Sequence, residues 1–165
     1  MTRPSPTVVV ADERSETDSP DVVIDVERWR RLTVAVLADS EAVGELTLSF
    51  VDREDIAELN LEYMGKPGPT DVLSFPMDDE PADEVPTLLG DVVISPAVAA
   101  GQYAEHAGTL DDELALLVVH GILHVLGHDH SEPDETAVMR ARELELLERF
   151  HWSGGAPAGF RQTHD

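Results

Sequence analysis

The apolar residues of this chain recur with two different periods that alternate along the sequence. Between residues 45 and 51, Leu46, Leu48 and Phe50 alternate with polar residues, which is the period of a half-buried strand. Between residues 26 and 38 the apolar residues recur every three or four positions, as in an amphipathic helix. Short apolar runs at 8–10, 72–75 and 88–94 predict three further strands.

Capping residues mark where the other helices should begin. Asp52 starts one helix, which Gly65 ends, and Ser95 followed by Pro96 starts another. Thr109 starts a helix that should run to about residue 126. Its apolar residues surround the helix axis, so this helix is predicted to lie in the core. A last helix is predicted from residues 131–134 to about residue 150.

This alternation predicts one compact α/β domain. A small mixed sheet of about four strands should be covered by helices, with the apolar helix packed on the sheet. The 165 residues match a single domain in size, and no linker divides them. We expect the domain to span residues 1–150, followed by a flexible C-terminal tail at 151–165.

Composition narrows the class of protein. The chain has no cysteine, which excludes a disulfide scaffold, a thiolate nucleophile and a sulfur-ligated zinc site. No signal peptide or membrane span is visible, so we expect a soluble, cytoplasmic protein without a membrane partner. The formal net charge is -23, and no basic residue occurs between Lys66 and Arg140. This balance disfavours non-specific attraction to polyanions, and the acidic segment 77–86 should be an exposed loop.

Three histidines suggest a metal site. His120 and His124 are four residues apart on the predicted core helix and therefore share a face. Gly127 allows the chain to turn, so that His130 can supply a third nitrogen. Three nitrogens leave one tetrahedral position open, as in a catalytic zinc site, and we expect one Zn²⁺ per chain. A single buried histidine is more often a core residue, but two in so apolar a helix need partners.

The neighbouring residues limit the chemistry. The spacing H-x-x-x-H-x-x-G-x-x-H is shared with metzincin proteases, which carry a glutamate base directly after the first histidine. Gly121 occupies that position here, which argues against peptide hydrolysis. His128 is expected either to face solvent or to line the rim of the pocket. His106, His151 and His164 have no supporting neighbours in the sequence and are expected at the surface.

The string HGILHVLGHDH at residues 120–130 resembles the signature of the YbeY family of metal-dependent endoribonucleases. Segments 59–76 and 89–94 resemble two further family motifs, so the resemblance covers most of residues 45–150. It implies that His120, His124 and His130 are the metal ligands. It also implies cleavage of single-stranded RNA, a role in ribosomal RNA processing (16S rRNA 3'-end maturation) and ribosome quality control, and ribosomal RNA and ribosomal particles as partners. We expect no DNA partner.

One position departs from the family pattern. Many members carry an arginine directly after the tyrosine of the central motif, where this chain has Met64. We predict that Lys66 takes the place of this arginine. Asp129 is predicted to assist catalysis, as a partner of a ligand imidazole or of the substrate, and its alternative role is to cap the helix that follows. Two alternatives are a zinc-dependent hydrolase of another substrate, such as a phosphoester or peptide, and a non-catalytic ribosome-assembly factor that uses zinc structurally.

Overall fold

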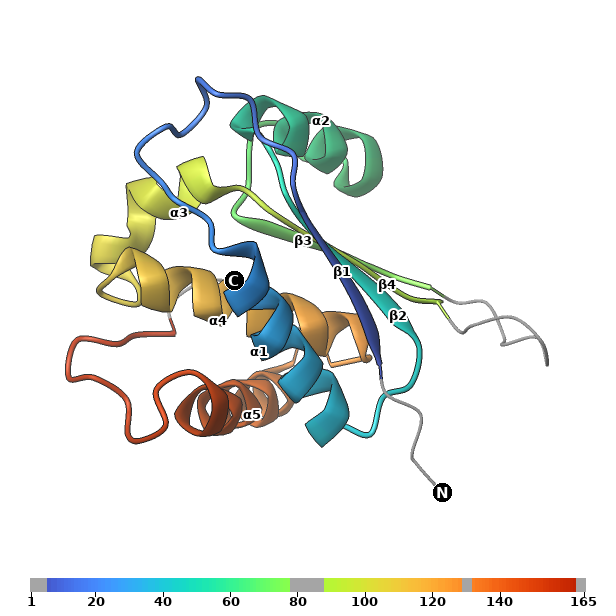
Figure 1. Cartoon of the computed structure of the whole chain (residues 1–165), viewed down its shortest axis with the longest axis vertical. Helices are drawn as coiled ribbons and strands as arrows, with labels where there is room; N and C mark the ends of the chain where they lie inside the picture. Colours follow the sequence, from blue (N-terminus) through green and yellow to red (C-terminus); the bar gives the residue numbers. More distant parts are fainter. Residues whose placement is uncertain (1–5, 78–87, 129–131, 163–165) are drawn as a thin grey trace.

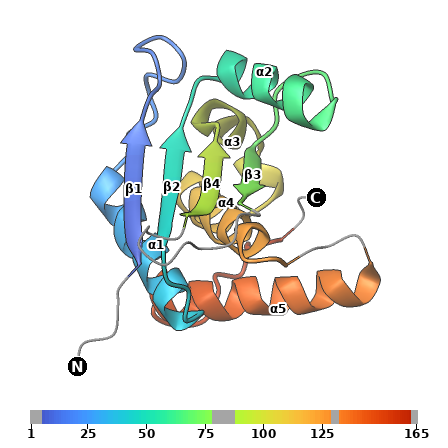
Figure 2. The ribbon, with the colours of Figure 1, turned by 90° about the vertical axis from the view of Figure 1, so that its right-hand side faces the viewer.

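A four-stranded mixed sheet forms the centre of the computed structural model, which describes residues 6–77, 88–128 and 132–162. The strands are β1 (Thr7–Asp12), β2 (Glu45–Phe50), β3 (Val72–Pro76) and β4 (Leu88–Ile94), in the order β1-β2-β4-β3 (Figure 2). The first three strands in this order are parallel, and β3 runs antiparallel to β4. The predicted mixed sheet and α/β class are confirmed.

In the described part of the chain five α-helices surround the sheet, and three of them begin directly after the predicted caps Asp52, Ser95 and Thr109. They are α1 (Val26–Asp39), α2 (Arg53–Met64), α3 (Pro96–Gln102), α4 (Leu110–Val125) and α5 (Pro133–Phe150), with a 3₁₀ turn at Tyr103–Glu105. Ser95 and Thr109 accept hydrogen bonds from Val98 N and Asp112 N, as expected for N-caps. The Asp52 carboxylate instead accepts from the backbone N of Ser15, so it fastens an earlier loop rather than capping α2.

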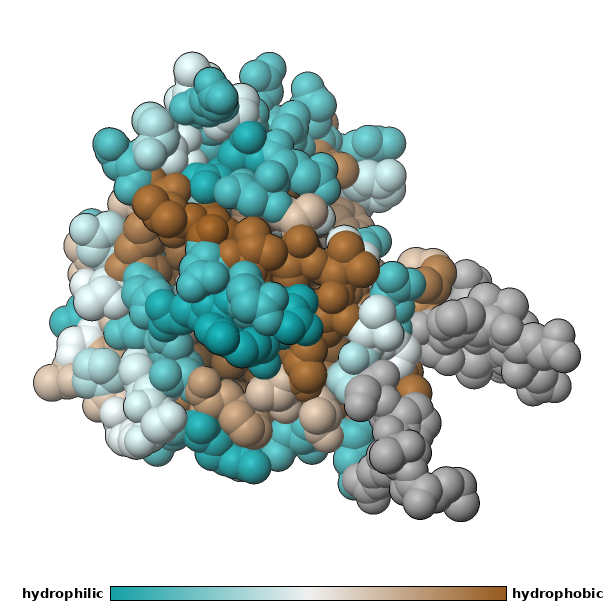
Figure 3. All heavy atoms as spheres, viewed as in Figure 1, coloured by the Kyte–Doolittle hydropathy of each residue, from teal (hydrophilic) through white to brown (hydrophobic). Residues whose placement is uncertain are grey.

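The main core lies between one face of the sheet and the helices α1, α4 and α5 (Figure 1). Leu46, Leu48 and Phe50 of β2 point into it and are fully buried, as their alternation predicts. The exposed face of α1 is hydrophilic and is bordered by apolar side chains (Figure 3), as expected for an amphipathic helix. A smaller cluster around Ile56 packs α2 against the opposite face of the sheet.

The contact between β3 and β4 depends on a glycine. The pairing of β2 with β4 skips one residue beside Gly90, whose φ is +149°. A Cβ at Gly90 would lie 2.4 Å from the backbone oxygen of Phe75, so no other residue fits without moving β3. β3, paired with β4 in this way, also lies beside the predicted metal-binding helix, where Ser74 contacts Gly121.

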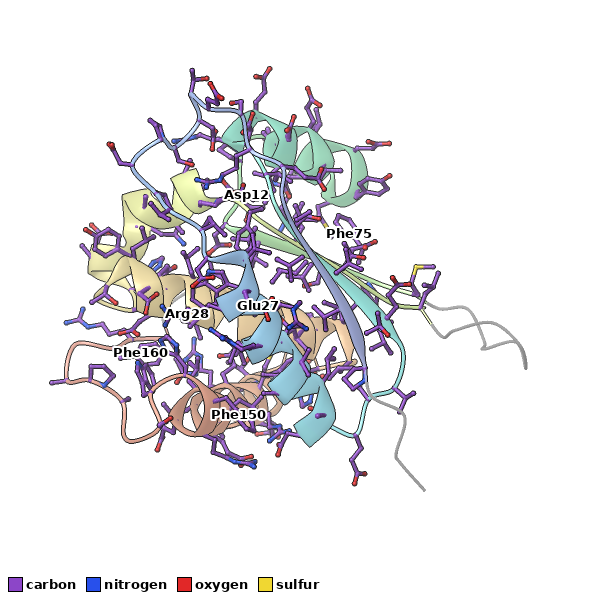
Figure 4. All side chains as sticks on the ribbon, viewed as in Figure 1. Asp12, Glu27, Arg28, Phe75, Phe150 and Phe160 are labelled. Carbon is purple, nitrogen blue, oxygen red and sulfur yellow. The ribbon has the colours of Figure 1, made fainter. Side chains whose placement is uncertain are left out.

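Residues 151–162 fold back onto the domain. Trp152 and Phe160 pack against the main core, and their ring centroids are 4.8 Å apart (Phe160 is labelled in Figure 4). The indole Nε1 of Trp152 donates to Asp112 Oδ1 at 2.9 Å. The flexibility expected of the tail stays a prediction, but its described part is attached to the domain by these contacts.

Within the described part of the chain, no helix is long and apolar enough to cross a membrane. The apolar helix α4 is instead buried along nearly its whole length between the sheet and α5. This agrees with the prediction that a helix with apolar residues all round belongs in the core. The acidic segment predicted at 77–86 lies almost entirely outside the described residues.

Candidate metal centre

Two of the three predicted ligands converge on one point. His120 and His124 lie one turn apart in the C-terminal half of α4, and their Nε2 atoms are 3.1 Å apart. The two rings are inclined by 78° with centroids 4.5 Å apart, so both nitrogens are directed at the same region from different planes. The spacing along the helix predicts that both side chains lie on one face, and their rotamers bring the two Nε2 atoms together.

A buried carboxylate stands behind His120. Glu143 of α5 lies 2.5 Å from His120 Nδ1, and its side chain is only 2% exposed. A carboxylate at this distance takes a hydrogen bond from the ring, which places a proton on Nδ1 and the lone pair on Nε2, the nitrogen nearer to His124. Glu143 Oε1 accepts a second hydrogen bond, at 3.0 Å, from Nε2 of Gln162.

This arrangement fits a divalent metal. In a tetrahedral site with metal–nitrogen bonds of about 2.0–2.1 Å, neighbouring nitrogens are separated by about 3.3 Å. The observed 3.1 Å separation of the two Nε2 atoms is close to that value. A carboxylate–histidine–metal arrangement is also the usual way in which proteins fix the tautomer and orientation of a ligating imidazole.

His120 and His124 line a cleft with a volume of about 390 Å³. Its other walls come from the end of α2, the following turn and β3, so residues 66–76 and α4 border one cleft. Its described lining is Asn60, Met64, Lys66, Thr70, Val72, Leu73, Ser74, Pro76, His120 and His124. Lys66 is the only basic side chain in this described lining, and Met64 lies beside it.

The turn that carries Lys66 is ordered by two contacts. Buried Asn60 donates from Nδ2 to the backbone oxygen of Gly68 at 3.0 Å. Gly65 ends α2 in the left-handed conformation at φ +67°, as its position after the apolar face predicts, and the backbone N of Lys66 donates to Asn60 O at 3.3 Å. These contacts hold the turn at residues 65–68 against α2, next to the cleft.

Gly121 explains why no glutamate follows the first histidine. A Cβ at this position would lie 2.5 Å from Val92 Cγ1 and 3.3 Å from Ser74 Oγ. The Ser74 hydroxyl also donates to the Gly121 backbone oxygen at 3.0 Å. The helix therefore touches β3 and β4 at this glycine, and the position where a metzincin keeps its base has no room for a side chain.

Other predicted residues have different outcomes. His130 and Asp129 lie outside the described residues. His128 is half-buried, and its described neighbours include Gly127, Asp134 and Val138, which line a separate hollow with it. The expectation that His106 and His151 are surface residues is wrong, because they contact Glu113 and Asp112, respectively, and the His151 side chain is 4% exposed. Asp112 lies 39 residues from His151 in the sequence, and Glu113 lies seven residues from His106 in the next α-helix, so local spacing gave no signal for either pair. His164 lies outside the described residues.

A second group of residues could hold a metal ion, namely Asp111, Asp112 and His151. Its ligand atoms already have protein partners. Arg28 forms a two-pronged pair with Asp111 at 2.5 and 2.6 Å and approaches His151 Nδ1 at 3.3 Å (Arg28 is labelled in Figure 4). His151 Nε2 lies 2.7 Å from Asp112 Oδ1. The guanidinium supplies the cation that this acidic group requires.

The sequence reading missed Glu143 and Gln162. A signal for Glu143 was available, because it occupies a buried position in the apolar stripe of α5 that also contains Met139, Leu146 and Leu147. A glutamate in such a stripe needs a partner. Gln162 carried no comparable signal, since only the folded chain brings its amide to Glu143.

The chain is similar to known proteins of one family. A family model described as Endoribonuclease YbeY matches residues 12–151. A relative named Endoribonuclease YbeY from Mycolicibacterium vanbaalenii is 42% identical over 151 residues, which cover 87% of this chain and 80% of the relative. One of the same name from Thermobifida fusca is 48% identical over 134 residues, covering 76% of this chain and 86% of the relative.

The fold is similar to the solution structure of TM1509 from Thermotoga maritima, with a TM-score of 0.55 and 19% sequence identity. The match covers 96% of this chain and 99% of that one, and it supports the fold alone. The family match and the identities over most of the chain go further and support an endoribonuclease role. The chain belongs to the endoribonuclease YbeY family.

Proposed function

We propose that this protein is a zinc-dependent, single-strand-specific endoribonuclease that acts in ribosomal RNA processing. The observation that carries the proposal is the convergence of His120 and His124 at 3.1 Å, with Glu143 behind the first ring. His130 is the proposed third ligand. Family membership supports the endoribonuclease part, and the histidine geometry supports the metal.

A zinc ion held there would lower the pKa of coordinated water and stabilise negative charge on phosphoryl oxygens. The protein's own part is to orient the ligands and shape the cleft. Glu143 keeps the His120 proton on Nδ1, so Nε2 stays available as a ligand. Because Glu143 is buried, this contact is shielded from water and competing ions.

Lys66 is the residue that we propose contacts the substrate phosphate. It is exposed and belongs to the cleft lining, where Met64 offers no hydrogen-bond donor. Asp129 is proposed to assist as a partner of a ligand imidazole or of the substrate. With a net charge of -23, the protein should bind RNA through local contacts in the cleft rather than through long-range attraction.

The proposed substrate is ribosomal RNA within ribosomal particles, with 16S rRNA 3'-end maturation and ribosome quality control as the cellular roles and the cytoplasm as the location. Peptide hydrolysis is disfavoured, since Gly121 has no room for the base that metzincins place there.

The test is the substitution His124→Ala in the full-length protein. We expect loss of stoichiometric zinc, measured by elemental analysis, together with loss of single-stranded RNA cleavage. His106→Ala is the matched control, because His106 is a half-buried histidine that contacts Glu113 outside the cleft. It should retain both metal and cleavage. Cleavage by His124→Ala in nuclease-free preparations would refute the assignment.

A non-catalytic zinc-containing assembly factor is the second candidate, and Met64 in the cleft favours it. That role predicts that the protein co-sediments with ribosomal particles and that Lys66→Met, which keeps the zinc ligands, leaves its cellular function intact. The endoribonuclease role predicts that Lys66→Met slows RNA cleavage while the zinc content stays the same. Assays against RNA, peptide and phosphoester substrates, with and without a chelator, separate the remaining hydrolase alternatives.

A further inference from the structure

The geometry points to Gln162, in the C-terminal segment, as a positioning residue of the metal centre that acts through Glu143 on His120. This inference rests on the proposed zinc site. Residue 162 lies beyond the 12–151 region that the family model matches. The C-terminal segment would therefore add a component to the site that the matched region does not contain.

Glu143 is held from both sides. One carboxylate oxygen, Oε2, lies 2.5 Å from His120 Nδ1, and the other, Oε1, accepts from Gln162 Nε2 at 3.0 Å. The same Gln162 nitrogen donates to the backbone oxygen of Arg140 at 2.9 Å, one turn before Glu143 on α5. Gln162 is thus anchored to the helix that carries the carboxylate.

Two anchored oxygens fix the plane of the carboxylate. The terminal torsion of a glutamate is broad, so a carboxylate with one partner can rotate. With Oε1 held by Gln162, Oε2 remains directed at the His120 ring. The orientation of that ring sets the direction of Nε2, which lies 3.1 Å from the Nε2 of His124. Orienting a ligand in advance reduces the entropic cost of ordering its side chain when the metal binds.

The segment that brings Gln162 to this place is itself fastened. Trp152 and Phe160 pack against the main core, with an edge-on contact of 4.8 Å between their rings. Gly159 lies against Gly108, where an added Cβ would be 3.2 Å from the Gly159 backbone oxygen. The backbone N of Phe160 donates to Pro157 O at 3.1 Å. These contacts therefore hold the C-terminal segment in place where it passes beside α5.

The experiment measures zinc affinity of the full-length protein by competition with a chromophoric chelator. Glu143→Gln should weaken zinc binding by about 10- to 100-fold, the usual effect of losing a partner of a ligating histidine. Gln162→Met removes the donor at similar size and should weaken binding by about tenfold, near the lower end of that range. Gln162→Glu, which keeps the shape but lacks the amide donor, should lose at least as much.

The double variant separates positioning from a general structural effect. If Gln162 acts through Glu143, then Gln162→Met in the Glu143→Gln background should change zinc affinity by no more than about twofold. Arg161→Ala, at the exposed neighbouring position, is the control and should bind zinc like the wild type. Equal losses in both backgrounds, or a Gln162→Met variant that binds like Arg161→Ala, would overturn the inference. Failure of the wild type to bind zinc would instead overturn the proposed zinc site.

Discussion

Replacing Gly121 by alanine tests whether α4 is held against the sheet at this residue. An added Cβ would lie 2.5 Å from Val92 Cγ1 and 3.3 Å from both Ser74 Oγ and Val72 Cγ2. Carbon atoms prefer separations of about 3.5–4.0 Å, so Val92 or the helix would have to move by about 1 Å. Val92 is fully buried, which leaves its side chain little room to give way.

Two effects oppose one another in this variant. Alanine is favoured over glycine in a helix interior by about 1 kcal/mol. Overpacking a core costs about 1–3 kcal/mol. The contact at 2.5 Å is with a buried side chain rather than a flexible surface one, so we expect the upper part of the overpacking range. After the gain from alanine, the free energy of unfolding should fall by about 1–2 kcal/mol, which corresponds to about 2–8 °C in melting temperature.

Urea unfolding followed by circular dichroism measures the change. Gly101→Ala is the matched control, because Gly101 is also helical, in α3, and nothing lies within 4 Å of its Cβ position. The control should gain stability by up to about 1 kcal/mol. If Gly121→Ala is as stable as the wild type or is stabilised like the control, then the close packing of α4 on β3 and β4 at Gly121 is refuted.

Two further predictions concern the sheet and acid stability. Gly90→Ala should cost about 3 kcal/mol or more in urea unfolding, because its Cβ would meet Phe75 O at 2.4 Å and its φ is +149°. Gly155→Ala, in open space, should be nearly neutral, and equal effects would contradict this explanation. The side-chain hydrogen bonds from Arg14 lower the pKa of Asp12, so this pair stabilises the fold at neutral pH and its contribution is lost as the pH falls through the lowered pKa. Urea unfolding at a series of pH values measures the difference in unfolding free energy between the wild type and Asp12→Asn. This difference should be largest near neutrality and should disappear at acid pH. A difference that does not change with pH would contradict the stabilising role of the pair.

Local patterns determined the elements of this protein and part of its site. The two-residue period of β2 and the caps at Ser95 and Thr109 act over a few residues, so they can be read without the fold. The same holds for His120 and His124, because a spacing of four on a helix brings two side chains to one face whatever surrounds them.

Tertiary structure decided which groups support those histidines. Glu143 reaches His120 only because α5 packs beside α4, and Gln162 reaches Glu143 only because the last segment folds back over the core. Likewise, a glycine is required at position 121 because Val92 of the sheet packs directly against it. Contacts between residues far apart in sequence depend on how elements pack, and periodicity and capping carry no information about that packing.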